Sequence, residues 1–152
     1  MPQILSKYFG TIDYVEEQVV RFPSGLPSFE EEDQFLIIRP ADRAPLVFLQ
    51  SMRQPSLCFL TLPILVIDPH YHLEMTTEDL ASLELDTSRQ PVIDGKVDCL
   101  AVLVAPEDGP PSANLLAPIV INPQTRLGIQ AIRLDSEYSH QHPLARPEDI
   151  CS

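Results

Sequence analysis

The sequence contains few of several residue types, and each shortage excludes a class of protein. There is no Trp, there are only five Gly, and no GxGxxG loop or GxSxG nucleophile elbow is present. The longest nearly apolar run, Leu57–Ile67, contains Thr61 and Pro63. A membrane-spanning helix needs about 20 apolar residues, so this run indicates a core segment. Nucleotide binding through a glycine-rich loop, serine-hydrolase chemistry and a helical membrane span therefore lack support.

Cysteine is also scarce. Cys58, Cys99 and Cys151 make an odd number without a CxxC pair, whereas a disulfide framework normally has an even count. The first residues lack the basic start and apolar stretch of a signal peptide. We expect free thiols in a protein of the cytoplasm.

Basic residues are few relative to acidic ones. Ten Lys and Arg stand against 22 Asp and Glu, which gives a formal charge of −12. A surface of this sign repels phosphate backbones, so direct binding to nucleic acid is disfavoured. It would attract a basic partner and speed the encounter. Acidity that only maintains solubility is the simpler alternative.

Sixteen prolines divide the chain into short runs rich in Val, Ile, Leu and Phe. Runs of this length, bounded by Pro, Gly, Asn or Asp, are typical of strands. The predicted strands are Tyr8–Tyr14, Gln18–Phe22, Phe35–Arg39, Leu46–Ser51, Leu57–Leu62, Tyr71–Met75, Val97–Ala105, Ala117–Asn122 and Leu127–Asp135.

Three connections can be predicted as well. Residues 122–126 read as a turn that joins the last two strands into a hairpin. Thr76 followed by Asp79 predicts a capped helix over Thr77–Leu85. A turn near Phe29–Asp33 would place four successive acids on the surface.

The segment Val97–Ala105 is apolar on both faces in its second half. This pattern predicts a central and well-covered strand.

The fold class that follows is mainly β. We expect one domain over residues 1–144, with a short tail at 145–152. Its architecture should be an antiparallel sandwich or a partly closed barrel with one or two short helices.

Two His-x-His pairs are the main candidates for chemistry. His70 and His72 would share one face of a strand and could reach one metal ion, and His140 and His142 repeat the spacing. A small metal-dependent barrel enzyme using His70 and His72 would follow if the pairs converged. Two unrelated, partly exposed pairs are the simpler interpretation, so we predict no catalytic residue, metal or cofactor.

Asn114 lies between a Pro-rich segment and an apolar strand. Its side chain can bond neighbouring backbone groups and fix the loop, which is the interpretation we favour. An outward-facing Asn114 could instead offer a donor and an acceptor to a partner.

Read in order, several segments resemble one known family. They are Lys7-Tyr8-Phe9-Gly10, Val20-Arg21-Phe22, Gly25-Leu26-Pro27-Ser28-Phe29-Glu30, Leu49-Gln50-Ser51, the block from Ser112 to Asn122, Asp135-Ser136-x-Tyr138-Ser139 and His142-Pro143-Leu144. Their order and spacing over residues 4–144 resemble the flagellar assembly factor FliW family.

The resemblance implies a regulator without enzymatic activity. Proteins of this family bind flagellin before its export and bind the RNA-binding translational repressor CsrA, so that free factor relieves repression of flagellin translation. A flagellin-only chaperone is the alternative. Charge and motif positions suggest partner contacts at the acidic run, at Asn114 and at the C-terminal segment, with these candidate residues: Glu30, Glu31, Glu32, Asp33, Asn114, Tyr138 and His142.

Overall fold

The computed structural model describes residues 2–26, 29–105, 109–132 and 138–144. Its strands are β1 Gln3–Ser6, β2 Gly10–Asp13, β3 Val19–Arg21, β4 Gln34–Ile38, β5 Val47–Ser51, β6 Cys58–Pro63, β7 Asp98–Val104, β8 Ser112–Ala113, β9 Ile119–Asn122, β10 Leu127–Gln130 and β11 His142–Pro143. The α-helices are α1 Ile64–Ile67 and α2 Thr77–Ser82, and short 3₁₀ turns occupy Glu16–Gln18 and Ala41–Arg43.

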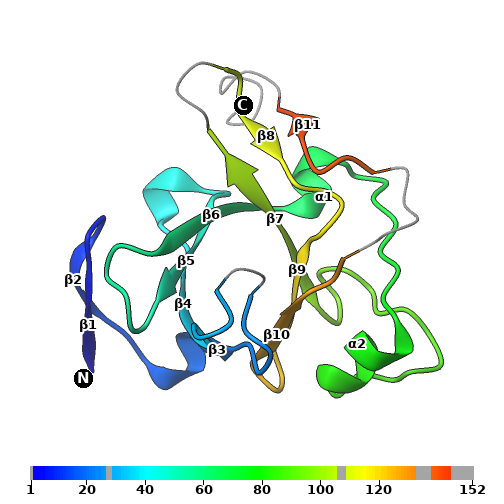
Figure 1. Ribbon diagram of the computed structural model, residues 1–152, viewed down its shortest axis with the longest axis horizontal. Helices are drawn as coiled ribbons and strands as arrows, with labels where there is room; N and C mark the ends of the chain where they lie inside the picture. Colours follow the sequence, from blue (N-terminus) through cyan, green and yellow to red (C-terminus); the bar gives the residue numbers. More distant parts are fainter. Residues whose placement is uncertain (1, 27–28, 106–108, 133–137, 145–152) are drawn as a thin grey trace.

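Seven of these strands close into a barrel. They follow the order β7-β6-β5-β4-β3-β10-β9, and β9 also pairs with β7, which completes the ring (Figure 1). The neighbours are antiparallel except β3 and β10, which are parallel. The prediction of a mainly β, largely antiparallel fold is confirmed, and of the two predicted architectures the barrel is the correct one.

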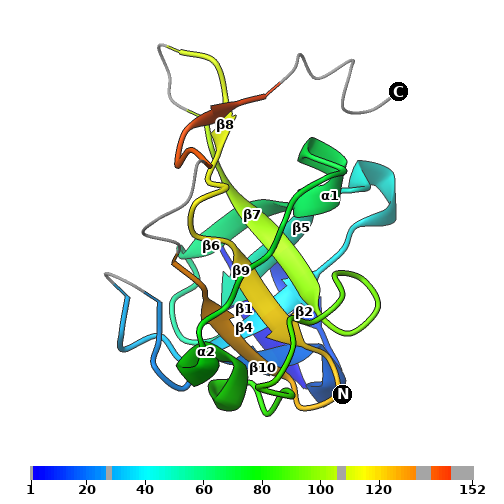
Figure 2. The same cartoon turned by 90° about the vertical axis from the view of Figure 1, so that its right-hand side faces the viewer.

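β7 is the strand on which the architecture depends. Its first residues pair with β9, its middle with β6, and its last two with β8, which in turn pairs with β11. Figure 2 shows β7 running out of the ring towards β8. The strand is central, as predicted, but its second half is not well covered, because beyond Val102 it no longer pairs with β6 and Val104 is 52% exposed.

Strand alternation divides the apolar residues into two cores. Leu100, Ile119 and Ile121 point into the ring, where they join a cluster that includes Phe22, Phe35 and Leu49. Cys99, Ala101 and Val120 point outwards and meet Ile64, Leu73, Met75, Leu80 and Leu83 from the segment between β6 and β7. We call residues 64–97 the outer layer, because they cover this side of the barrel.

The prediction of a strand at Tyr71–Met75 is wrong. Tyr71, Leu73 and Met75 alternate into the outer core as a strand would, but no ladder forms along them. Side chains take the place of a neighbouring strand. The Tyr138 hydroxyl accepts from the His72 amide at 2.8 Å, and the Gln90 amide group bonds both backbone groups of Met75.

Two other predicted elements are shorter than expected. α2 begins after its Thr76 cap, as predicted, but ends at Ser82 because Glu84 adopts a left-handed conformation with φ 58°. β10 ends at Gln130: the Ala131 amide still donates to the Pro118 carbonyl in the same register, but Pro118 has no amide hydrogen with which to return the bond. Residues 133–135 of the predicted strand lie outside the described residues, as do Cys151 and the 145–152 tail.

The β9–β10 hairpin forms through the predicted 122–126 turn. β1, α1, β8 and β11 were not anticipated, because each is four residues or fewer and carries little pattern. β1 and β2 form a separate hairpin that packs on β5, where Ser6 bonds Gln50 and the Phe9 ring contacts Phe48, and on the turn after it, where the Lys7 amide donates to the Pro55 carbonyl.

The closure between β3 and β10 depends on close packing, because only Leu127 and Arg21 are registered across it. A Cβ on Gly128 would lie 2.7 Å from the ring of the fully buried Phe22. We therefore predict that Gly128→Ala lowers the free energy of unfolding by about 1–3 kcal/mol. Urea denaturation measures this.

Gly95→Ala is the control. The nearest side chain there is Val92, which is 69% exposed and can move aside. A change within about 0.5 kcal/mol is expected for it. Equal losses in the two variants would contradict a specific contact at Gly128.

Candidate functional site

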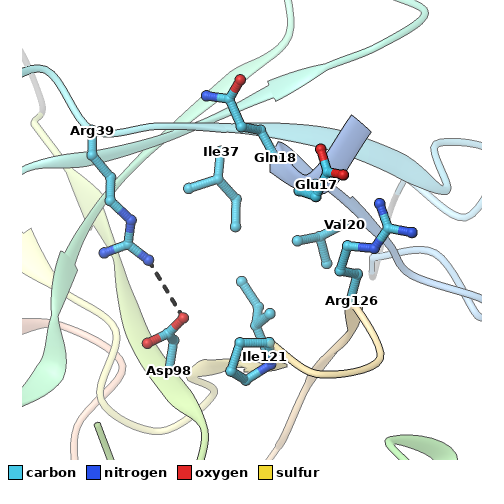
Figure 3. Close-up of a pocket in the computed structure, with 9 residues that line it drawn as sticks. Glu17, Gln18, Val20, Ile37, Arg39, Asp98, Ile121 and Arg126 are labelled. Carbon is cyan, nitrogen blue, oxygen red and sulfur yellow. Dashed lines mark hydrogen bonds and ion pairs between the residues drawn. The ribbon is translucent and has the colours of Figure 1, made fainter. Parts of the chain in front are cut away.

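The barrel has a mouth at each end of β7, and the two mouths differ in chemistry. Asp98, the first residue of β7, belongs to one, and Val104, its last, to the other. The mouth at Asp98 is a cavity of about 330 Å³ with a floor of Val20, Ile37 and Ile121. Figure 3 shows these side chains between Arg39 and Arg126.

Charges at the Asp98 mouth are balanced and already engaged. Arg39 follows β4 and pairs with Asp98 across the opening at 3.4 Å, although two strands separate β4 from β7 in the ring. Arg126 donates to the carbonyl of Glu16 at 2.7 Å. These contacts make the rim part of the barrel closure, so we do not choose it as the binding site.

The opposite mouth is the more apolar of the two and is partly open. It holds a cavity of about 280 Å³ lined by Leu26, Phe29, Phe59, Val102, Val104, Asn114, Ile119, Gln130, His140 and Gln141. We call this set the apolar mouth. Phe29 and Val104 remain 37% and 52% exposed there. Because large exposed apolar side chains border one concavity here, this mouth is the candidate binding surface.

A row of aromatic rings leads from the barrel interior to this mouth. Phe22 contacts Phe35 with ring centroids 5.5 Å apart, Phe35 contacts Phe59 at 5.8 Å, and Phe59 contacts Phe29 at 5.5 Å. The first two rings are fully buried and the last is exposed. The first and last of these contacts are edge-on and the middle one is tilted, and such contacts favour particular ring orientations, so Phe29 packs against the core behind it.

The described residues between Phe22 and Asp33, which we call the mouth loop, correct one prediction. The turn forms, and Glu30, Glu31 and Asp33 are exposed, but Glu32 is only 5% exposed. Its carboxylate accepts hydrogen bonds from Ser51 and Gln54. The acidic run is therefore three surface acids and one buried one, because the turn that exposes its neighbours rotates Glu32 inwards.

Asn114 has the structural role that we favoured. Its Oδ1 accepts from the amides of Leu116 and Ala117, each at 3.0 Å, and so shapes the connection from β8 to β9. The side chain also borders the apolar mouth. Asn114 thus fixes part of the mouth wall.

The C-terminal candidates lie near the same end of the molecule. His140 and Gln141 line the apolar mouth, while His142 is half-buried in β11 beside β8. Tyr138 is half-buried; its ring lies 4.4 Å from that of Tyr71, whose hydroxyl donates to the Leu115 carbonyl at 2.7 Å.

The histidine pairs do not form a metal centre among the described residues, where no three His, Cys, Asp or Glu side chains gather in suitable positions. His70 and His72 are exposed, and His72 Nε2 lies 3.3 Å from Glu74. Burial raises the pKa of the Cys58 thiol to about 11 and that of Cys99 to about 12. Both are protonated at neutral pH and are weak nucleophiles.

Two features of the surface were missed from the sequence. Phe59 and Val104 were assigned to strands without a role in a site, although the unbroken apolar run at the end of β7 was a signal for it. The outer layer was missed too: residues 64–97 contain seven acidic residues against two basic ones, Arg89 and Lys96. No helix in the described ranges has both the length and the apolar character to cross a bilayer.

The geometry defines a small closed β-barrel with a partly open apolar mouth at one end and an acidic outer layer. Known proteins share its fold. A family model described as FliW protein matches residues 3–144. A crystal structure of the flagellar assembly factor FliW superposes with a TM-score of 0.81 at 33% identity, covering 97% of this chain and 99% of the other.

Curated relatives match over most of their length. A flagellar assembly factor FliW of Geobacillus sp. is 37% identical over 148 residues, 97% of this chain and 98% of the relative. Its counterpart in Bacillus subtilis is 32% identical over 142 residues, 93% and 95%. That of Syntrophomonas wolfei is 32% identical over 146 residues, 95% and 90%. The chain belongs to the FliW family of flagellar assembly factors.

Asn114 offers a test of how the mouth wall is built. Asn114→Ala leaves two loop amides without their acceptor, so we predict a loss of about 1–3 kcal/mol of unfolding free energy. Asn114→Asp keeps an acceptor oxygen and should recover most of it. Thermal or urea unfolding measures the stability of both variants. Equal losses of unfolding free energy would contradict the role of the Asn114 acceptor oxygen.

Proposed function

We propose that this protein binds flagellin in the cytoplasm and also binds a CsrA-type translational repressor, thereby relieving repression of flagellin translation. Family membership supports a role in flagellar assembly. The observation that carries the flagellin arm is the apolar mouth with its exposed Phe29 and Val104.

Flagellin assembles through amphipathic terminal helices, whose apolar faces must be covered before export. A helix of this kind lays an apolar face into a hydrophobic groove. Phe29 and Val104 supply exposed anchors for such a face, and Phe59 and Val102 lie beneath them. Exposed Glu30 and Glu31 stand beside the mouth and would favour a helix with Lys or Arg along its flanks.

The repressor arm has an electrostatic basis. CsrA binds RNA and so must present basic surfaces, to which a chain of charge −12 is attracted. The outer layer concentrates that charge, with Glu78 on α2 and Glu84 just after it both exposed. The bound acidic protein would also repel RNA from the complex.

The flagellin arm is tested with Phe29→Ser. An aromatic anchor at the centre of a contact typically contributes enough that its loss weakens binding about tenfold or more. Calorimetry with flagellin measures this. Leu5→Ser, at a leucine that is 62% exposed on the β1–β2 hairpin, is the matched control and should leave affinity unchanged. Equal effects of the two variants would reject the apolar mouth as the flagellin site.

The repressor arm predicts a dependence on salt. Exposed charges are screened beyond about 10 Å at 0.1 M salt, so binding to CsrA should weaken as salt rises. Glu78→Gln combined with Glu84→Gln should lower affinity at low salt and flatten the dependence. Arg89→Gln, which removes a nearby cation, should raise the affinity at low salt and make the salt dependence steeper.

Titration into CsrA at two salt concentrations, with and without bound flagellin, tests the whole proposal. Binding that flagellin abolishes supports a partner switch. Binding to flagellin without binding to CsrA would leave a flagellin-only chaperone, and binding to neither would overturn the proposal.

A further inference from the structure

Glu32 is a buried carboxylate in a protein whose other acidic residues are mostly at the surface. It is 5% exposed, and no described Lys or Arg forms an ion pair with it. Burying a charged group costs free energy that packing alone does not return, and a hydrophobic residue of similar volume is often as stable. The contribution of the Glu32 carboxylate to the structure must therefore come from its hydrogen bonds.

Its partners lie on a different segment of the chain. Ser51 Oγ donates to Glu32 Oε2 at 2.6 Å, and Gln54 Nε2 donates to Oε1 at 2.5 Å. Ser51 Oγ itself accepts from the amides of Arg53 and Gln54. Since its acceptor capacity is used in this way, the hydroxyl proton points to Glu32.

The turn that holds these donors is itself firmly fixed. The fully buried Gln50 places its Nε2 within 3.1–3.3 Å of four carbonyl oxygens of the turn, and its Oε1 accepts from Ser6 Oγ at 2.7 Å. A carboxylate bonded to this turn is therefore bonded to a rigid part of the barrel rim.

On its other side, Glu32 belongs to the loop that carries Phe29. The Glu32 amide donates to the Phe29 carbonyl at 2.9 Å, and the Phe29 amide donates to the Leu26 carbonyl at 2.7 Å. Gly25, with φ 67°, lets the loop fold back so closely that a Cβ would lie 2.5 Å from Glu30 Cα. Fixing the Glu32 side chain thereby fixes the backbone turn from which the Phe29 ring projects.

We propose that Glu32 is a positioning residue, whose bonds to Ser51 and Gln54 hold the mouth loop so that Phe29 forms a preorganised wall of the apolar mouth. A partner that meets a wall already in place loses less conformational entropy on binding. The effect on flagellin binding rests on the proposed function, whereas the effect on the order of the mouth loop does not.

The test uses three variants of the full chain. Glu32→Leu removes both acceptors at similar volume. Glu32→Gln keeps one acceptor for Ser51, and its new amide can donate to Gln54 once the Gln54 amide turns over, so it is the conservative rescue. Glu16→Leu is the control, at an exposed acid whose backbone bonds Arg126 of the opposite mouth. Gln54→Ala, at an exposed position where folding is not at risk, removes one donor from the other side.

Hydrogen exchange of the Phe29 and Glu32 amides reports on the loop, and calorimetry with flagellin reports on binding. In Glu32→Leu we expect loop exchange to rise and flagellin affinity to fall, each by about tenfold or more, while β5 and β7 amides stay near their original rates. Glu32→Gln should restore both readouts, Glu16→Leu should change neither, and Gln54→Ala should shift both in the same direction by less.

Three results would overturn the inference: equal acceleration of exchange throughout the barrel, unchanged loop exchange in Glu32→Leu, or unchanged flagellin affinity despite a loosened loop. If Glu32→Leu does not fold, Gln54→Ala decides by the same criteria. If the unmodified protein does not bind flagellin, the proposed function fails on that observation, and the exchange pattern alone decides whether Glu32 positions the loop.

Discussion

The pairing of β7 with β9 is the contact on which the rest of the structure depends. It closes the ring, and by closing it gives each strand an inner and an outer face that must be filled separately. The inner face takes the aromatic and branched residues, and the outer face takes the residues 64–97 that cover it. β7 continues past the ring to pair with β8, so its last residues lose the cover of the barrel. The apolar mouth is a consequence of that continuation.

The two ends of the barrel differ in how their charged and polar side chains are bonded. At the Asp98 end, polar groups bond one another across the opening and join non-adjacent strands. At the Val104 end, Glu32 and Asn114 are turned towards the protein and bonded to its own side chains and amides, while Phe29 and Val104 remain exposed. The bonds that join non-adjacent strands therefore lie at one end of the barrel, and the exposed apolar surface lies at the other.

Much of the fold could be predicted from the sequence because most strands carry a short apolar run between clear breaks. The incorrect predictions have physical causes that a short apolar run in the sequence cannot reveal. Tyr71–Met75 has the alternation of a strand, but hydrogen bonds to Tyr138 and Gln90 replace a ladder, and neither partner is visible locally. Glu32 reads as one acid among four, and only the geometry of its turn decides that it faces inwards. Asn114 was predictable because its partners are two and three residues away.

The parallel contact between β3 and β10 joins parts of the chain made at very different times during synthesis. Arg126 bonds Glu16 from 110 residues away, whereas β3 to β6 pair with their immediate successors. The early strands can therefore form a meander while the chain is still being made, but the ring cannot close until β10 has left the ribosome. Until that moment, β3 presents an unpaired edge to any neighbouring nascent chain. For a protein made from closely spaced ribosomes, the interval between these two events sets the period in which aggregation competes with folding.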